Sequence, residues 1–255
     1  MTEANQFDLR FELEQPYPRL FVTVSGAHLY GFASPDSDYD LRGVHVLPVE
    51  EVVGLEGGRE TIEVSDVQEG RELDLVTHDA RKFFLLLLKK NGYVLEQLYS
   101  PLVLESSREH EELKAIARKC ITRHHVYHYR HFADAQWKLL EKQETRTVKA
   151  LLYVYRVLLT GVHLMRTGEV QANLVELNRE FRLRYVDELI ERKTTSREKG
   201  PLAEKELAFH QSEFGRLRQL LEEEGVRTAL PDAPSGRGEL NELLVRMRKF
   251  GVTKR

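Results

Sequence analysis

The chain has 255 residues, of which 41% are hydrophobic and 31% charged, and its formal net charge is −3. A chain of this size can bury the core of one large domain or of two modest ones. Its single cysteine, Cys120, excludes an intramolecular disulfide and a cysteine-based zinc site. The small net charge does not indicate general coating of nucleic acid, although the stretch Arg146–Arg156 could form a local basic patch.

The sequence gives no sign of a membrane segment or of a targeting signal. The longest apolar run, Phe83–Leu88, is far shorter than the about 18 residues of a spanning helix. The N-terminal stretch MTEANQFDLRFELEQ carries acidic residues and no apolar segment, which argues against a secretory signal or an arginine-rich transit peptide. We therefore expect a cytoplasmic protein with no membrane partner.

The N-terminal part of the chain alternates short β-branched runs with helical segments, as α/β and α+β units do. Leu20–Ser25 is predicted to be a strand that stops at Gly26, and Tyr39–Leu47 a second strand closed by Pro48. The further predicted elements are strands at Thr61–Val64 and Glu72–Thr77, a helix at Ala80–Lys90 capped by Thr77 or Asp79, and a short helix at Val94–Tyr99.

From Glu109 onward the strand patterns end and helical periodicity takes over. Helical stretches are predicted at Glu111–Glu144, Val148–Arg166 and Glu204–Glu224, and at Glu239–Phe250 after a Pro/Gly loop, Leu230–Gly238. We therefore expect an α+β chain. Residues 1–105 would form a mixed β-sheet domain with flanking helices, and residues 106–255 an α-helical domain.

The segment from Ser25 to Gly43 reads SGAHLYGFASPDSDYDLRG and combines the parts of a phosphate and metal site. A strand that ends at Gly26 and opens into a short helix presents backbone N–H groups to a phosphate. Asp38 and Asp40 lie two residues apart at the start of the next strand. Their carboxylates would therefore project from one face and could bridge hard divalent cations.

Such a site usually needs a third carboxylate from a neighbouring strand. Asp74 is the best candidate, because Leu73 and Leu75 flank it and would point into the core on the opposite face. Glu72 shares the face of Asp74 and is the reserve candidate. An ordinary acidic turn is the alternative interpretation of Pro-Asp-Ser-Asp, but the added carboxylate and the strand order favour the site.

The motif resembles the signature of the DNA polymerase β-type nucleotidyltransferase superfamily, a glycine pair or Gly-Ser followed about ten residues later by Asp-x-Asp. More narrowly, YGFASPDSDYDLRG followed by DLVTHDARKFFLLLLKKNGYVLEQLYSP is similar to a prokaryotic and phage branch of predicted nucleotidyltransferases. Phage RNA-ligase-associated proteins belong to that branch. The resemblance covers about Phe21–Pro101.

The resemblance implies transfer of a nucleoside monophosphate from a nucleoside triphosphate to a hydroxyl, with release of pyrophosphate. It implies that Asp38, Asp40 and Asp74 are catalytic and hold Mg²⁺ or Mn²⁺. Residues 1–105 would then be the catalytic domain, and residues 106–255 would bind the acceptor or the nucleotide.

Five residues around the motif are predicted to bind the nucleotide: Ser25, Gly26, Ala27, His28 and Arg42. The family commonly has Ser where this chain has Ala27, and backbone amides, Ser25 or His28 would have to compensate. Loss of such a hydrogen bond to a charged group typically costs about 1.5–3 kcal/mol. Arg42 either contacts phosphate or holds a carboxylate in place, and we favour the second role.

Two groups of helical residues are further candidates. Lys149, Tyr153 and Arg156 fall at i, i+4 and i+7 and could meet the triphosphate or base, as the Lys and Tyr residues of related ribonucleotidyltransferases do; a solvated helix face is the alternative. His124 and His128 share a face with His131, but with no acidic or third-helix ligand apparent we favour a polar or RNA-facing surface over a metal site.

The favoured acceptor is the 3′ end of an RNA, a tRNA or another RNA, which rests on the resemblance and on the basic helical stretch. A protein Ser, Thr or Tyr side chain and a small molecule are the alternatives. A rival from another class is a catalytically idle relative that binds nucleotide or RNA as a regulatory or adaptor protein, with Ala27 as the mark of lost function.

Overall fold

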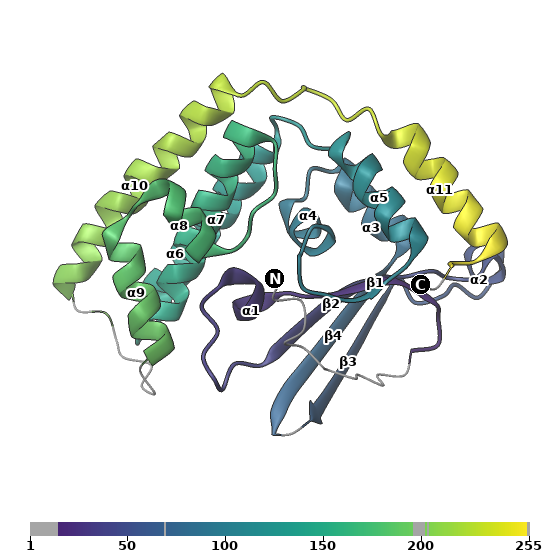
Figure 1. Cartoon of the computed structure of the whole chain (residues 1–255), viewed down its shortest axis with the longest axis horizontal. Coiled ribbons are helices and arrows are strands. Elements are labelled where there is room, and N and C mark those ends of the chain that lie inside the picture. Colours follow the sequence, from purple (N-terminus) through teal and green to yellow (C-terminus); the bar gives the residue numbers. More distant parts are fainter. Residues whose placement is uncertain (1–14, 69, 196–201, 203, 254–255) are drawn as a thin grey trace, which may run out of the picture. The chain divides into compact units, whose positions relative to one another are not determined.

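The computed structural model describes residues 15–68, 70–195, 202 and 204–253 (Figure 1). The chain divides into two compact units. The described parts of the first unit lie within Met1–Leu29, Asp38–Cys120 and Pro234–Arg255, and the second unit comprises Tyr30–Ser37 and Ile121–Ala233. The fold class is α+β, with a mixed sheet in the N-terminal part and helices in the C-terminal part, as the sequence predicted.

The first unit is built on a five-stranded sheet of order β3-β4-β2-β1-β5. Strands β2 and β4 run parallel, whereas the other neighbouring pairs are antiparallel. The strands are β1 (Arg19–Val24), β2 (Tyr39–His45), β3 (Thr61–Gln68), β4 (Arg71–Asp79) and β5 (Val103–Ser106). The sequence predicted the first four within a few residues at their ends. It missed β5, a four-residue edge strand without a buried side chain.

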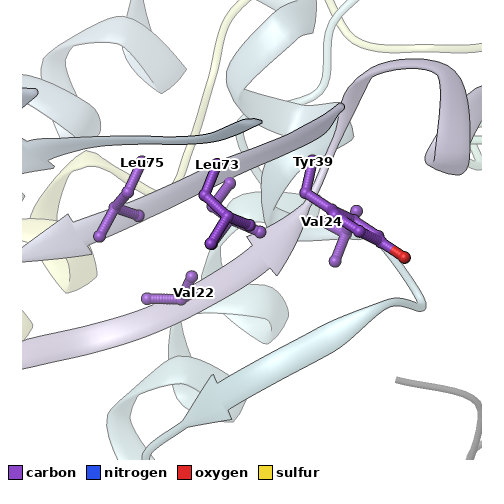
Figure 2. Packing of buried hydrophobic residues seen from close by; sticks show 6 residues of the cluster. Val22, Val24, Tyr39, Leu73 and Leu75 are labelled. Carbon is purple, nitrogen blue, oxygen red and sulfur yellow. The ribbon is translucent and has the colours of Figure 1, made fainter. Parts of the chain in front are cut away.

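One face of the sheet carries a buried apolar cluster. Val22 and Val24 of β1 meet Tyr39 and Leu41 of β2 and Leu73 and Leu75 of β4, each at most 8% exposed (Figure 2). Because side chains alternate along a strand, this arrangement directs Asp40, Arg42 and Asp74 to the opposite face. The prediction that Leu73 and Leu75 point away from Asp74 into the core is confirmed.

The first unit also contains the helices α2 (Val49–Val53), α3 (Ala80–Leu88), α4 (Gly92–Leu98), α5 (Arg108–Arg118) and α11 (Arg237–Phe250). Of these, α3, α4 and α5 contact the sheet on the face opposite the apolar cluster, and α11 packs on α3 and α5. Phe21 of β1 lies against Phe83 of α3, with ring centroids 5.6 Å apart, and stacks on His110 of α5 at 4.3 Å. Asp79 caps α3, as predicted, by accepting the N–H of Arg81 at 3.0 Å.

The units do not divide the chain at residue 105, which the sequence analysis had placed as the domain boundary. Helices α5 and α11, expected in the helical domain, belong to the unit that contains the sheet. His110 of α5 stacks on Phe21, and Arg248 of α11 pairs with Asp79. Helical periodicity shows that a helix has an apolar face, but it does not show which hydrophobic core that face packs against. The sequence analysis therefore assigned α5 and α11 to the wrong unit.

The second unit is helical apart from its first segment. It contains α6 (His125–Lys142), α7 (Val148–Thr167), α8 (Leu174–Phe181), α9 (Arg184–Thr195) and α10 (Glu204–Arg227). The single helical stretch predicted at Glu111–Glu144 is wrong, because α5 ends at Arg118 and α6 begins at His125. The chain passes from the first unit to the second between Cys120 and Ile121, inside that break.

Helix α7 is long and apolar enough to cross a membrane by length and composition, with a mean hydropathy of 1.3 over its best window. The sequence analysis had looked for an unbroken apolar run and missed it. However, 78% of that window is buried inside the structure, as in the core helix of a globular unit. Spanning length is therefore weak evidence for a membrane role.

The stability of the first unit is expected to fall as the pH drops from about 6.5 toward 5. Burial first, and then the charge of Lys82, lowers the pKa of His78 in β4 to about 4. Below pH 6.5 the unfolded chain therefore binds a proton at His78 that the folded chain does not bind. We expect a loss of about 1–2 kcal/mol by pH 5 in urea unfolding. A His78→Gln variant should lose less, and an equal loss in both proteins would contradict this explanation.

Candidate active site

Two aspartates on neighbouring strands lie side by side on the face of the sheet opposite the apolar cluster. Asp40 of β2 and Asp74 of β4 are direct partners in the parallel register. Parallel neighbours are about 4.8 Å apart, so the two carboxylates share one small region of the sheet. Their side chains are 38% and 45% exposed, which leaves both open to a ligand.

Arg42 joins the two aspartates. Its Nη2 lies 3.1 Å from Asp40 Oδ1 and 3.4 Å from Asp74 Oδ2. Its Nη1 donates to the backbone oxygens of Leu41 and Asp74, both at 2.8 Å, and its Nε donates to the hydroxyl of Tyr93 at 3.2 Å. These contacts are those of a residue that holds carboxylates in place, the role the sequence analysis favoured.

Arg42 is also electrostatically tied to this site. Burial alone would lower the pKa of Arg42, but Tyr93, Asp40 and Asp74 outweigh it and raise the pKa. The guanidinium is therefore charged at every working pH, and its side chain is only 14% exposed. The site therefore contains one permanent positive charge, on Arg42, and two carboxylates, those of Asp40 and Asp74.

Gly26 approaches Asp40 so closely that no side chain fits. Its φ is +62°, and a Cβ at this position would lie 1.8 Å from Asp40 Oδ2. The neighbouring Ser25 donates its backbone N–H to the carbonyl of Asp40 at 2.7 Å. The turn after β1 is thereby joined to the strand that carries Asp40, and the sequence motif is brought together in space.

The three side chains around Gly26 have different environments. Ser25 is 1% exposed, so its hydroxyl is poorly placed to replace that of the serine that the family has at the position of Ala27. Ala27 is 6% exposed. His28 stacks on Tyr39 with ring centroids 4.4 Å apart. Helix α1, Gly26–Tyr30, is only five residues long, so its dipole is small.

Asp38 lies just before β2 and is exposed. Throughout the described ranges, no hydrogen bond or ion pair holds its side chain. Its position is therefore set by the backbone on either side of it. Asp38 remains a predicted ligand whose carboxylate is available.

The residues predicted on α7 belong to the second unit. Lys149 is exposed, and Tyr153 makes edge contacts with Tyr30 and Phe32 at ring distances of 5.5 and 5.6 Å. Arg156 is 1% exposed, and its guanidinium lies over the ring of Tyr30 at 4.0 Å. This burial argues against nucleotide contact by Arg156. Charged residues at helical spacing usually face solvent, but α7 is buried on most of its surface.

The histidines predicted to share one helix face lie in α6 or directly before it and differ in burial. His125 is fully buried, whereas His124 and His128 are half-buried. Burial, followed by the charge of Arg156, lowers the pKa of His128 to about 4.

The chemistry of the aspartates fits a divalent cation, although they do not form a ready cage. Carboxylate oxygens are ligands that Mg²⁺ and Mn²⁺ prefer. Within residues 15–68, 70–195, 202 and 204–253, no three His, Cys, Asp or Glu side chains are grouped so that they could hold a metal ion as they stand. Arg42 takes one oxygen of Asp40 and one of Asp74. A cation bound there would share both carboxylates with Arg42.

Two residues of this site were missed by sequence reasoning. Tyr93 of α4 is a partner of Arg42, and Ser65 of β3 donates to Asp74 Oδ1 at 3.3 Å. Neither stands in a motif. The alternation of β3 and β4 could have placed Ser65 opposite Asp74 if their register had been known. Glu72, the reserve candidate, precedes the residues of β4 that pair with β2, so Asp74 is the better placed carboxylate.

A mixed sheet that brings Asp40 and Asp74 together beside a glycine turn agrees with the resemblance to the polymerase β-type nucleotidyltransferase superfamily. The sequence model of RlaP, the RNA repair pathway DNA polymerase beta family, matches residues 2–246, and the chain belongs to this family.

Two curated proteins are similar to this chain in sequence, and both are uncharacterized. The uncharacterized protein MJ0002 of Methanocaldococcus jannaschii is 36% identical over 156 residues, which cover 60% of this chain and 63% of the relative. The uncharacterized protein YcgL of Bacillus subtilis is 31% identical over 165 residues, which cover 62% and 61%. The chain thus spans about three fifths of the length of these curated relatives.

A solved structure with some likeness is that of a nucleotidyltransferase-like protein from Exiguobacterium sibiricum. The two chains are 13% identical, the match covers 92% of this chain and 71% of the other chain, and the TM-score is 0.31. At that score the likeness is too weak to support an inference about the fold or the site.

Proposed function

We propose that this protein transfers a nucleoside monophosphate from a nucleoside triphosphate to an acceptor hydroxyl, with Mg²⁺ or Mn²⁺ held by Asp38, Asp40 and Asp74. The register of Asp40 with Asp74 carries the proposal, because it places two hard-ligand groups next to each other on one sheet face. Membership of an RNA repair family favours an RNA 3′ hydroxyl as the acceptor.

Different residues of the first unit would bind the triphosphate and align the metal-binding carboxylates. Backbone N–H groups of the turn at Gly26 would hold the triphosphate at the end of β1. Arg42 and Tyr93 would keep the carboxylates of Asp40 and Asp74 aligned. The bound cation would supply charge neutralisation for the pyrophosphate and activation of the acceptor hydroxyl.

The acceptor is tested with RNA whose 3′ end is open or blocked. The protein is incubated with each of four α-labelled nucleoside triphosphates, Mg²⁺ or Mn²⁺, and RNA with a free 3′ hydroxyl or the same RNA after periodate oxidation. Label on the free RNA alone supports the proposal. Label that appears equally on oxidised RNA, or on added proteins and not on RNA, would reject an RNA 3′ acceptor.

Replacing Gly26 by Ala should disable the site without unfolding the unit. The new Cβ would overlap Asp40 Oδ2, so the carboxylate must move. Displacement of a reacting group by about 1 Å costs on the order of a hundredfold in rate. Gly70→Ala is the matched control, because Gly70 also has a positive φ, +78°, but has no atom within 4 Å of an added Cβ. Equal activity of the two variants would contradict the role of the close contact.

An idle nucleotide-binding or RNA-binding adaptor is the second candidate, and two observations favour it. Ala27 lacks the hydroxyl common in the family, and Arg42 already contacts both Asp40 and Asp74 and offsets one of their two negative charges. The adaptor predicts nucleotide or RNA binding with no transfer of label under any of the above conditions. Transfer that disappears in Asp38→Ala would exclude it.

A further inference from the structure

The loop between the glycine turn and Asp38 belongs to the second unit, although both ends of the motif belong to the first. Residues Tyr30–Ser37 form part of the second unit together with Ile121–Ala233. The chain therefore leaves the first unit after Leu29 and returns to it at Asp38. Whatever holds this loop also limits, through the backbone, where Asp38 can lie.

The beginning of the loop is fixed by packing. Tyr30 is 3% exposed and Phe32 is fully buried, and the ring of Tyr153 meets both. Gly31 has a φ of +82°, and a Cβ there would lie 2.4 Å from Asn173 Oδ1. This close fit leaves the first three residues of the loop little freedom.

The end of the loop is held by polar contacts instead. Lys193 of α9 donates its Nζ to Ser34 Oγ at 2.7 Å. Ser34 in turn donates its backbone N–H to Ser37 Oγ at 2.9 Å, and Ser37 donates its N–H to the carbonyl of Ser34 at 2.9 Å. Ser37 directly precedes Asp38. A chain of contacts thus runs from the Lys193 ammonium to the residue before the predicted metal ligand.

We infer that Lys193 is a positioning residue that fixes Asp38 through Ser34 and Ser37. The inference rests on the proposed function, in which Asp38 is a ligand. Asp38 has no side-chain partner of its own in the described parts of the chain, so its alignment depends on this anchored backbone. A charge-assisted hydrogen bond to a hydroxyl is strong enough to order a short polar loop.

The test compares Lys193→Ala with Lys193→Arg, which can still donate to Ser34, and with Arg192→Ala on the same helix. Arg192 pairs with Glu206 at 2.8 Å and serves as the control for loss of a nearby charge. Backbone hydrogen exchange of the full chain without nucleotide is measured at Ser34 and Ser37. We expect exchange there to be about tenfold or more faster in Lys193→Ala, and close to wild type in Lys193→Arg and Arg192→Ala.

Kinetics separate positioning from substrate contact. In Lys193→Ala the kcat for label transfer should fall about ten- to hundredfold while the KM for nucleotide stays within about twofold. Ser34→Ala should act similarly, and the double variant should lose little more than either single one.

Unchanged exchange at Ser34 and Ser37 in Lys193→Ala would overturn the inference. So would a raised KM with unchanged kcat, because Lys193 would then contact the nucleotide itself. If no protein transfers label, wild type included, the proposed function fails, and the role assigned to Lys193 fails with it even if the exchange result confirms the anchoring.

Discussion

Replacing Asp40 by Asn is expected to reduce label transfer by at least about a thousandfold, because a metal-binding carboxylate contributes several kcal/mol of transition-state stabilisation. Asn keeps the shape of the side chain and can still accept from Arg42, so the fold should survive. Asp74→Asn should behave in the same way, since Asp74 lies in register with Asp40. Activity is measured with labelled nucleotide under saturating Mg²⁺ or Mn²⁺.

Glu72→Gln is the matched control for these two variants. Glu72 lies on β4, two residues before Asp74. Unlike Asp74, it has no partner on β2, because the pairing of β4 with β2 begins at Leu73. Its replacement should leave transfer within a few-fold of wild type. If Glu72→Gln abolished transfer and Asp74→Asn did not, the third carboxylate would be Glu72, and our assignment of the site would be wrong.

Replacing Arg248 by Met is expected to destabilise the first unit by about 3–5 kcal/mol, because it leaves a buried carboxylate without its countercharge. Arg248 Nη2 lies 2.7 and 2.6 Å from the two oxygens of Asp79, and Arg248 also donates to the carbonyl of Leu47. The two paired side chains are only 8% and 3% exposed. This pair fastens the C-terminal helix α11 to the sheet.

Arg246→Ala provides the control, since Arg246 of the same helix pairs with Glu112 where both side chains are more than 40% exposed. Its loss should cost less than about 1 kcal/mol in urea unfolding. The double variant Arg248→Met/Asp79→Asn should regain part of the lost stability, because Asn keeps the cap of α3 without the charge. A loss below about 1 kcal/mol for Arg248→Met as well would show that the buried pair contributes little to the stability of the unit.

The segment from Ser25 to Gly43 could be recognised from sequence because its information is local. Strand periodicity placed Asp40 correctly at the start of β2, whereas Asp38, predicted on the same strand, lies just before it, and Leu73 and Leu75 gave the orientation of Asp74. The close contact of Gly26 with Asp40 could not be predicted, because it depends on the register of β1 with β2, and no local sequence pattern specifies that register.

The assignment of helices to units could not be predicted, because it depends on contacts between distant parts of the chain. The pair of Arg248 with Asp79 joins residues 169 positions apart, and the contact of Lys193 with Ser34 joins residues 159 apart. Arg156 shows the same limit for a single side chain. Its spacing from Lys149 suggested an exposed face, whereas the aromatic ring of Tyr30 covers its guanidinium.

The most direct measurement of the central claim uses one nucleoside triphosphate labelled in turn at the α- and the γ-phosphorus, with Mg²⁺ or Mn²⁺ and RNA. The proposed chemistry predicts that α-label enters the acceptor, that γ-label leaves as pyrophosphate, and that both events stop in Asp40→Asn. Transfer of γ-label to the acceptor, or α-label transfer that persists in Asp40→Asn, would contradict the account.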